Sequence, residues 1–276
     1  MRQRAIRNLA RLNTSQARIT RMLDAAAGGK NNFVADRDAV RRYDEAAPVT
    51  TAAARAVLAF LARVIRHLAA GGVDQFVIVG SGVPSGLPAG RQLHDLAGDA
   101  LGRTGARVLY VENDPMVLAY AQATIEPVND LVRVVEGDIR QVEDLLGDRV
   151  VKTFIDWDRP VGLVLVSVPS LGEEEARHAI KCLCHAAARG SYLALLQTTF
   201  DAIPDELLPA IGELLAMTLP GHVVRTRAES AALLEGLDLV EPGLVWVPEW
   251  RPDGRDEACA ALPSASGNYG AVARVL

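Results

Sequence analysis

The sequence predicts an α/β protein with a doubly wound, mostly parallel sheet of seven strands, one of which is an antiparallel edge strand. Short apolar segments alternate with amphipathic ones from about residue 75 to residue 217, as in parallel strands joined by helices. The segment 161–168 is an almost unbroken apolar run, which is typical of a strand buried on both faces. With 276 residues, 50% of them hydrophobic, the chain is long enough for one large core.

Helices are expected before the first strand. They cover residues 1–27, 36–45 and 50–70. The first ends at Gly28-Gly29, and the third carries an apolar face that stops at Gly71-Gly72, because glycine commonly terminates helices. We therefore divide the chain into an N-terminal helical arm, residues 1–46, and an α/β domain, residues 47–276.

The sheet and its covering helices follow. Strands are predicted over residues 75–79, 107–111, 131–136, 161–168, 191–197, 244–247 and 269–275. Helices are predicted over residues 91–101, 115–125, 173–188, 204–217 and 228–234. No helix separates the last two strands, which predicts the antiparallel strand at the sheet edge.

Charge is distributed unevenly. The net charge is −5, but residues 1–46 carry ten bases and five acids, so the remaining chain has a net charge of −10. An acidic body makes nucleic acid an unexpected partner. The arginines of the first 21 residues are interpreted as the solvated face of a terminal helix or as a disordered segment, with contact to phosphate or an anionic surface as the less favoured alternative.

The cysteines and the hydropathy pattern suggest a cytoplasmic protein. Cys182, Cys184 and Cys259 form an odd set without a metal-binding spacing, so we expect reduced thiols and no metal. No run of eighteen apolar residues and no apolar signal core is found, so no membrane association is expected. The sequence leaves a homodimer open.

Candidate binding residues follow three consecutive strands. Gly80-Ser81-Gly82 ends the first strand, Glu112 ends the second, and Gly137-Asp138 follows the third. Glycine allows the backbone to approach a ligand closely, and a carboxylate can accept both ribose hydroxyls. Because parallel strands place their carboxyl ends at one edge, the three positions together predict a nucleoside site, although each acid alone is more often a solvated or capping residue.

The loop after Gly82 restricts the nucleotide. A dinucleotide site needs a helix that starts at a third glycine, but Pro84 and Pro88 interrupt this segment. No lysine follows in the arrangement of a phosphate-binding loop. The turn therefore suits a ligand without phosphates, such as S-adenosylmethionine, better than NAD.

Several longer segments carry a resemblance to a known family. They are Gly28–Ala39 (GGKNNFVADRDA), Ala54–Phe76, Gly80–Ser85 (GSGVPS), Leu93–Asp95, Tyr110–Ala121 (YVENDPMVLAYA), Glu136–Arg140 (EGDIR), Asp158–Val168, Gly190–Leu193, Thr226–Gly254 and Asn268–Arg274. Through them the sequence resembles the actinobacterial S-adenosylmethionine-dependent methyltransferases that carry a GGKDNF-type motif before a class I, Rossmann-like core. The resemblance covers nearly all of the chain from about residue 14.

The resemblance implies a role for each matching residue. Gly80, Ser81 and Gly82 would run under the methionine and ribose, Glu112 would hold the ribose hydroxyls, and Asn113, Asp114, Asp138 and Ile139 would border the adenine. Val166 and Ser167 would lie below the methionine. Lys30, Asn32 and Phe33 would belong to an N-terminal lid over the cofactor. The implied activity is methyl transfer to a small-molecule acceptor.

Four departures from the family pattern surround this site. Ile78 replaces an acid, Asn31 replaces the motif aspartate, Pro169-Ser170-Leu171 replaces a segment containing histidine, and the loop after Pro84 is longer. Loss of one charged hydrogen bond costs about 1.5–3 kcal/mol. A degenerate protein that binds the cofactor weakly or not at all, and acts as a binding or regulatory module, is therefore the alternative hypothesis.

The acceptor and the catalytic residue are less well determined. Methyl transfer depends mainly on positioning, so no catalytic motif is required, and His94, Asp95 and His178 are candidate bases by residue type alone. The region 246–268 is expected to border the acceptor, where Trp250 could stack on an aromatic ring.

Overall fold

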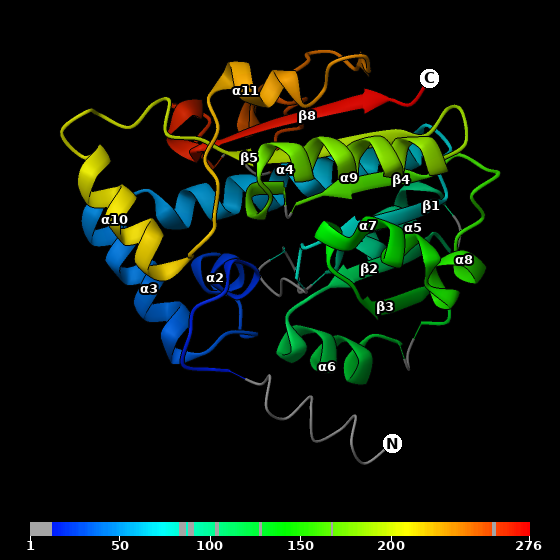
Figure 1. Ribbon diagram of the computed structural model, residues 1–276, viewed down its shortest axis with the longest axis horizontal. Coiled ribbons are helices and arrows are strands. Elements are labelled where there is room, and N and C mark those ends of the chain that lie inside the picture. Colours follow the sequence, from blue (N-terminus) through cyan, green and yellow to red (C-terminus); the bar gives the residue numbers. More distant parts are fainter. Residues whose placement is uncertain are drawn as a thin grey trace.

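The computed structural model describes residues 13–82, 87, 91–102, 105–126, 129–166, 168–255 and 258–276. An eight-stranded sheet forms its centre, with the order β3-β2-β1-β4-β5-β8-β6 and β7 paired to β8 (Figure 1). The strands are β1 Gln75–Val79, β2 Arg107–Glu112, β3 Val132–Glu136, β4 Gly162–Leu165, β5 Tyr192–Thr198, β6 Asp238–Leu239, β7 Val245–Trp246 and β8 Asn268–Arg274.

The predicted fold class is confirmed. Strands β1 to β5 are parallel, and β8 pairs with β5 in the antiparallel sense. The eighth strand, which the sequence does not predict, is the two-residue β6, and it pairs with β8 as β7 does. A two-residue strand has no room for the apolar alternation that marks longer strands.

Helices cover both faces of the sheet. One face carries α4 (Thr50–Ala70), α5 (Leu93–Ala100) and α6 (Pro115–Thr124), and the other carries α7 (Val142–Gly147), α8 (Arg149–Phe154) and α9 (Glu173–Ala186). Strand β1 serves both cores, because Phe76 and Ile78 pack on the α4 side while Val77 and Val79 pack on the α9 side. The sheet is therefore buried on both faces, as its apolar strands predict.

Helix α4 packs across the sheet as far as β8, where Gly270 leaves room for the Phe60 ring. A Cβ atom at Gly270 would lie 2.7 Å from the Phe60 ring, closer than side-chain atoms can approach. The missing side chain lets Phe60, which is fully buried, seat on the strand. The packing thus couples the longest helix to the antiparallel part of the sheet.

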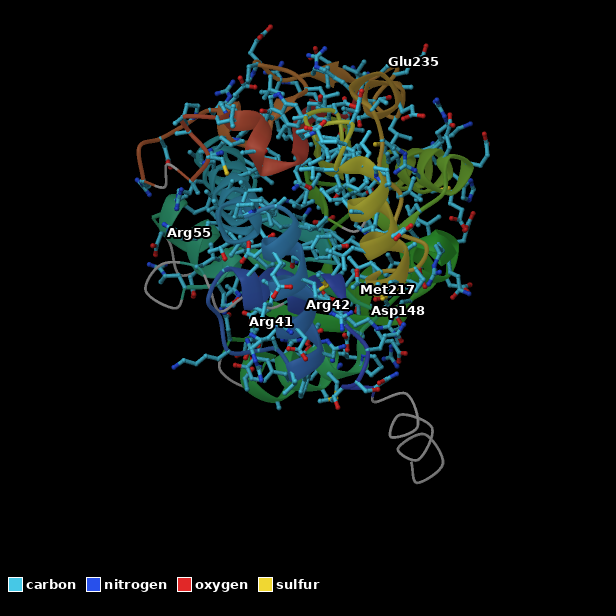
Figure 2. All side chains as sticks on the ribbon, turned by 90° about the vertical axis from the view of Figure 1, so that its left-hand side faces the viewer. Arg41, Arg42, Arg55, Asp148, Met217 and Glu235 are labelled. Carbon is cyan, nitrogen blue, oxygen red and sulfur yellow. The ribbon has the colours of Figure 1, made fainter. Side chains whose placement is uncertain are left out.

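The N-terminal arm gathers at one end of the sheet. Helices α2 (Ile19–Ala26), α3 (Val34–Ala46) and α10 (Leu208–Thr218) lie together there (Figure 1). Of the helix expected over residues 1–27, residues 13–18 are not helical and residues 1–12 lie outside the described part. Tyr43 of α3 shares a hydrogen bond of 3.0 Å with Thr218 of α10. Figure 2 views this end, where Arg42 and the exposed Met217 come within 3.9 Å of each other.

The connections contain short elements. They are η3 (Ile139–Gln141), η4 (Val168–Ser170), α11 (Arg227–Ala232), η5 (Val247–Glu249) and η6 (Pro263–Ser266). Within the described residues, no single helix has both the length and the apolar character needed to cross a membrane; α3 and α4 meet those criteria only as a pair, bent by 112°.

Candidate functional site

The turn after β1 brings a stretch of left-handed backbone to the carboxyl edge of the sheet. Gly80 and Gly82 have φ angles of 72° and 66°, which side chains other than glycine's rarely tolerate. The Gly80 N–H donates to the carbonyl of Val111 at 3.0 Å, so the turn is tied to β2. Ser81 is fully buried and donates its hydroxyl to the carbonyl of Gly82 at 2.9 Å.

Glu112 lies directly beside this turn at the end of β2. Its Oε1 accepts a hydrogen bond of 2.6 Å from the backbone N–H of Gly82. Its Oε2 is buried and has no hydrogen-bond partner among the described residues. Burial raises the pKa of Glu112 to about 8, and the nearby Asp114 carboxylate adds to this rise. The hydrogen bond from the Gly82 N–H acts in the opposite direction.

An unpartnered carboxyl oxygen of this kind fits a ligand hydroxyl, which can both donate and accept a hydrogen bond. Leaving a buried acceptor unsatisfied costs about 1–3 kcal/mol, which a ribose hydroxyl placed at Oε2 would recover. The backbone of Gly80 and Gly82 carries no side chain that would obstruct such a ligand. The Glu112 carboxyl group and the glycine backbone at the ends of β1 and β2 therefore suit the ribose of S-adenosylmethionine.

The structure also brings Asn113 and Asp138 together. The Asn113 side chain hydrogen-bonds to the Asp138 carboxylate, which caps η3 by accepting from the backbone N–H of Arg140 at 3.0 Å. Burial favours the neutral form of Asp138 and so raises its pKa, but hydrogen bonds from Arg140 and Asn113 outweigh this effect and hold the pKa below its ordinary value. Asp138 is thus a charged acceptor whose lone pairs are shared with Arg140. Ile139 is buried in the core cluster on the α9 side.

Helix α2 covers the glycine turn. A Cβ atom at Gly82 would lie 3.1 Å from the Cβ of Thr20, so the first turn of α2 packs closely on the glycine turn. Gly82, Ser81 and Glu112 are all buried.

A buried arginine fastens α2 to the sheet. Arg21 is 1% exposed, and its Nε lies 3.2 Å from the Asp114 carboxylate and 3.5 Å from that of Asp36. Asp114 in turn caps α6 by accepting from the Met116 N–H. The contact joins the N-terminal arm to the residue two positions after Glu112.

The expected lid residues occupy the loop between α2 and α3. The Asn32 side chain donates to the Asp24 carboxylate at 2.9 Å, and Phe33 lies beneath the Arg21 guanidinium, 5.1 Å from ring centroid to Cζ. Lys30 is exposed on the same loop. Phe33 therefore contacts Arg21, which in turn pairs with Asp114 beside the site. Asn32 instead stabilises the loop between α2 and α3.

Ile78 and the strand β4 complete the site's surroundings. Ile78 is fully buried, in register with Tyr110 and Val164, so the position that the family resemblance assigns to an acid is apolar and dry. The Val166 N–H donates to the Val79 carbonyl at 3.0 Å, which brings the end of β4 beside the turn. Ser167 and most of the long loop after Gly82 lie outside the described residues.

The candidate bases proposed by residue type do not converge on this edge. His94 is buried, with its Nδ1 3.1 Å from the Tyr110 hydroxyl, and burial lowers its pKa. Asp95 caps its own helix by accepting from the Gln92 N–H. His178 is exposed on α9 and contacts Glu143. All three have local roles that do not involve the glycine turn.

Trp250 cannot stack on an acceptor in this structure. Its side chain is fully buried, packed edge-on against Phe60 and His67. The expectation of an exposed aromatic platform at Trp250 is therefore wrong, because the chain after β7 folds inward onto α4. Arg63, also buried, holds this segment by donating to the carbonyls of Trp250 and Val247.

A polar group at the end of β5 is not evident from the sequence. His222 Nε2 lies 3.2 Å from the Thr198 hydroxyl, which in turn lies 3.2 Å from Asn268 Oδ1. Burial, with a contribution from Arg225, lowers the pKa of His222 to about 4, so the ring is neutral at pH 7. The three residues are separated by up to 70 positions and share no motif, so only the fold reveals them.

Comparison with known proteins places this geometry in context. The family model described as S-adenosyl methyltransferase matches residues 6–276. A Thermobifida fusca YX crystal structure, from a protein proposed to be a methyltransferase, is 29% identical over 95% of this chain and 96% of its own, with a TM-score of 0.84. A DUF574 family protein from Streptomyces avermitilis MA-4680 is 30% identical over 95% of this chain and 99% of its own, with a TM-score of 0.83. No curated protein matches the sequence.

Proposed function

The chain belongs to the S-adenosyl methyltransferase family, and we propose that it transfers the methyl group of S-adenosylmethionine to a small-molecule acceptor. One observation carries the proposal. The Glu112 carboxylate is buried at the end of β2 with Oε1 held by Gly82 and Oε2 without a partner. That arrangement leaves one buried carboxyl oxygen to hydrogen-bond a ribose hydroxyl at the edge where doubly wound sheets bind nucleotides.

The proposed cofactor contacts extend from Glu112 in two directions. Gly80, Ser81 and Gly82 would run under the ribose and methionine, with no side chain on the two glycines to obstruct them, and Ser167 is proposed to lie below the methionine. Asn113, Asp138 and Ile139 would border the adenine, where the charged Asp138 accepts from the exocyclic amine. When bound, the sulfonium supplies an activated methyl group, and the protein's task is to position the acceptor in line with it.

The N-terminal arm is proposed to act as a lid. Helix α2 rests on Gly82 and is held by the buried pair Arg21–Asp114, so it closes the site from above. Lys30, Asn32 and Phe33 lie on the loop that follows α2 and would move with it. Closure of this kind excludes water from a reaction whose competing path is hydrolysis.

The acceptor is proposed to bind beside the ends of β4 and β5. Thr198, His222 and Asn268 form a polar group there, and β4 pairs with both β1 and β5, so the group lies on the same edge as the glycine turn. Burial keeps the His222 imidazole neutral. A neutral imidazole nitrogen can orient an acceptor hydroxyl by accepting a hydrogen bond from it, but with a pKa of about 4 it is a weak base.

Calorimetric titration with S-adenosylmethionine and S-adenosylhomocysteine tests the proposal. We expect binding in the micromolar range, weakened by at least tenfold in Glu112→Gln and unchanged in the control Asp130→Asn, which alters an exposed acid at the opposite end of the strands. Absence of binding at millimolar ligand would contradict the proposal. It would favour the alternative, a protein of this fold that has lost the cofactor and acts as a binding or regulatory module, for which the apolar Ile78 is the structural argument.

A further inference from the structure

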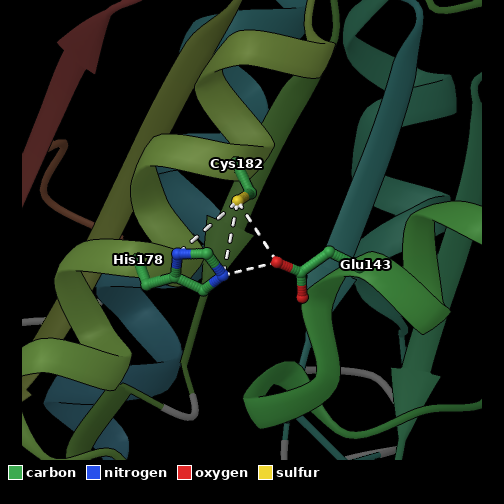
Figure 3. Close-up of side chains that lie close together, drawn as sticks. All are labelled: Glu143, His178 and Cys182. Carbon is green, nitrogen blue, oxygen red and sulfur yellow. Dashed lines mark hydrogen bonds and ion pairs between the residues drawn. The ribbon is translucent and has the colours of Figure 1, made fainter.

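Three metal-ligating side chains meet between α7 and α9, outside the site described above (Figure 3). Glu143 comes from the first turn of α7, and His178 and Cys182 come from α9. The His178 Nε2 lies 2.5 Å from Glu143 Oε1, and the Cys182 Sγ lies 3.7 Å from that nitrogen and 4.0 Å from that oxygen. Three donor atoms of different residues therefore face one point.

The positions along α9 favour chelation. His178 and Cys182 are four residues apart, so they lie on the same helix face one turn from each other. A helix fixes this spacing in advance, which reduces the conformational entropy lost when both residues bind one ion. Glu143 approaches the same face from a different element, and its side chain points at the other two in Figure 3.

The distances are close to those of a tetrahedral zinc site. With Zn–S near 2.3 Å and Zn–N and Zn–O near 2.0–2.1 Å, the ligand atoms of such a site lie roughly 3.3–3.6 Å apart. The sulfur–nitrogen distance of 3.7 Å and the sulfur–oxygen distance of 4.0 Å exceed the upper end of this range by about 0.1 and 0.4 Å. The hydrogen bond between His178 and Glu143 would open by about 0.8 Å, and both side chains are more than half exposed, at 55% and 64%, so they are free to rotate.

We propose that Glu143, His178 and Cys182 form a binding site for a zinc-class divalent ion, with water at the fourth position. The donor chemistry selects this class, because thiolate and imidazole suit Zn²⁺ and Co²⁺ whereas Mg²⁺ and Ca²⁺ require oxygen ligands. The carboxylate and the thiolate together balance the charge of the divalent ion. Binding releases the thiol proton of Cys182.

The ion would connect two elements that the chain separates by 35 residues. Helix α7 begins directly after η3, which Asp138 caps, and α9 packs on the same face of the sheet. A metal bridge between the two helices would therefore restrict the segment that carries Asp138. Cysteine spacing alone does not reveal the site, because only one of its ligands is a cysteine.

Cobalt titration of the full-length, reduced protein tests the inference. A thiolate bound to Co²⁺ gives a near-ultraviolet charge-transfer band, and tetrahedral Co²⁺ gives intense visible bands. We expect both bands in the wild type, their loss on addition of Zn²⁺, and no effect of Mg²⁺. Cys182→Ser should abolish the charge-transfer band, and His178→Ala and Glu143→Gln should each weaken Co²⁺ binding by at least tenfold.

The same helix supplies matched controls. Cys184→Ser and His185→Ala remove a cysteine and a histidine that lie next to the cluster in sequence but outside it, and both variants should bind Co²⁺ as the wild type does. Zn²⁺ should also raise the unfolding temperature of the wild type and of these controls, but not that of His178→Ala. Absence of the charge-transfer band in the wild type at millimolar Co²⁺, or its persistence in Cys182→Ser, would overturn the inference. These readouts do not depend on S-adenosylmethionine binding.

Discussion

The backbone N–H of Gly82 donates to Glu112 Oε1 at 2.6 Å, which ties the turn after β1 to the last residue of β2. One bond thereby orients the carboxylate and leaves its second oxygen available. The same bond opposes the effect of burial on the Glu112 pKa, which remains raised to about 8. Stability and ligand binding consequently depend on the same side chain.

Glu112 should make the folded protein less stable as pH rises. Its folded-state pKa lies above the unfolded value, so the native state binds the proton more tightly, and the free energy of unfolding should fall between about pH 4.5 and pH 8. The slope is at most about 1.4 kcal/mol per pH unit. Glu112→Gln should flatten it, whereas Asp130→Asn should not. Urea unfolding at several pH values measures the slope, and equal slopes in Glu112→Gln and wild type would contradict the assignment.

Arg21 should control the opening of α2. Arg21→Met keeps the length of the side chain but leaves the Asp36 and Asp114 carboxylates without their cation, a change that typically costs about 3–5 kcal/mol. Hydrogen exchange should accelerate over residues 19–26, with little change in the exposed control Arg18→Met. If Arg21→Met does not fold, Asp114→Asn provides the milder perturbation. Unchanged exchange over α2 in both variants would show that the ion pair does not hold the lid.

Ile78→Asp should strengthen cofactor binding at a cost in stability. The family resemblance places an acid here that would organise hydrogen bonds near the cofactor, and one charged hydrogen bond corresponds to about ten- to a hundredfold in affinity. The position is fully buried between Tyr110 and Val164, so the unfolding temperature should fall. Calorimetric titration beside thermal unfolding separates the two effects, with Ile78→Asn as the neutral control. An unchanged affinity in folded Ile78→Asp would remove this position from the determinants of binding.

Two glycines should respond to alanine in opposite directions. Gly270→Ala places a Cβ atom 2.7 Å from the Phe60 ring, and overpacking of this kind costs about 1–3 kcal/mol. Gly212 lies within α10 with open space around its missing side chain, so Gly212→Ala should stabilise the protein by roughly 0.5–1 kcal/mol. Urea unfolding measures both. Equal effects would show that α4 does not pack on β8 as described.

Elements with a strong apolar pattern were predictable from the sequence. The helix over residues 50–70 and the strand over residues 75–79 have the predicted bounds, because glycines 71 and 72 separate two clear periodicities. Helices α7 and α8 were not predicted, since six residues are too few to show a helical period. Their boundary depends instead on a side-chain cap, in which Asp148 accepts from two backbone N–H groups.

The candidate site was predictable only where strand ends converge. Glu112 and the glycine turn could be paired from sequence because parallel strands present their carboxyl ends at one edge. The contact of Arg21 with Asp114 joins residues 93 positions apart, and no local pattern encodes it. Trp250 shows the same limit, since composition does not distinguish an aromatic ring on a surface from one enclosed by α4.

The place of β8 in the sheet has a consequence for biosynthesis. Strand β8 pairs with β5 along seven residues and also carries β6 and β7. Until residues 268–274 have left the ribosomal exit tunnel, β5 has an unpaired edge, and neither β6 nor β7 has a partner. A nascent chain therefore exposes an apolar strand edge until residue 274 has emerged, by which point the parallel strands β1 to β5 can already have paired.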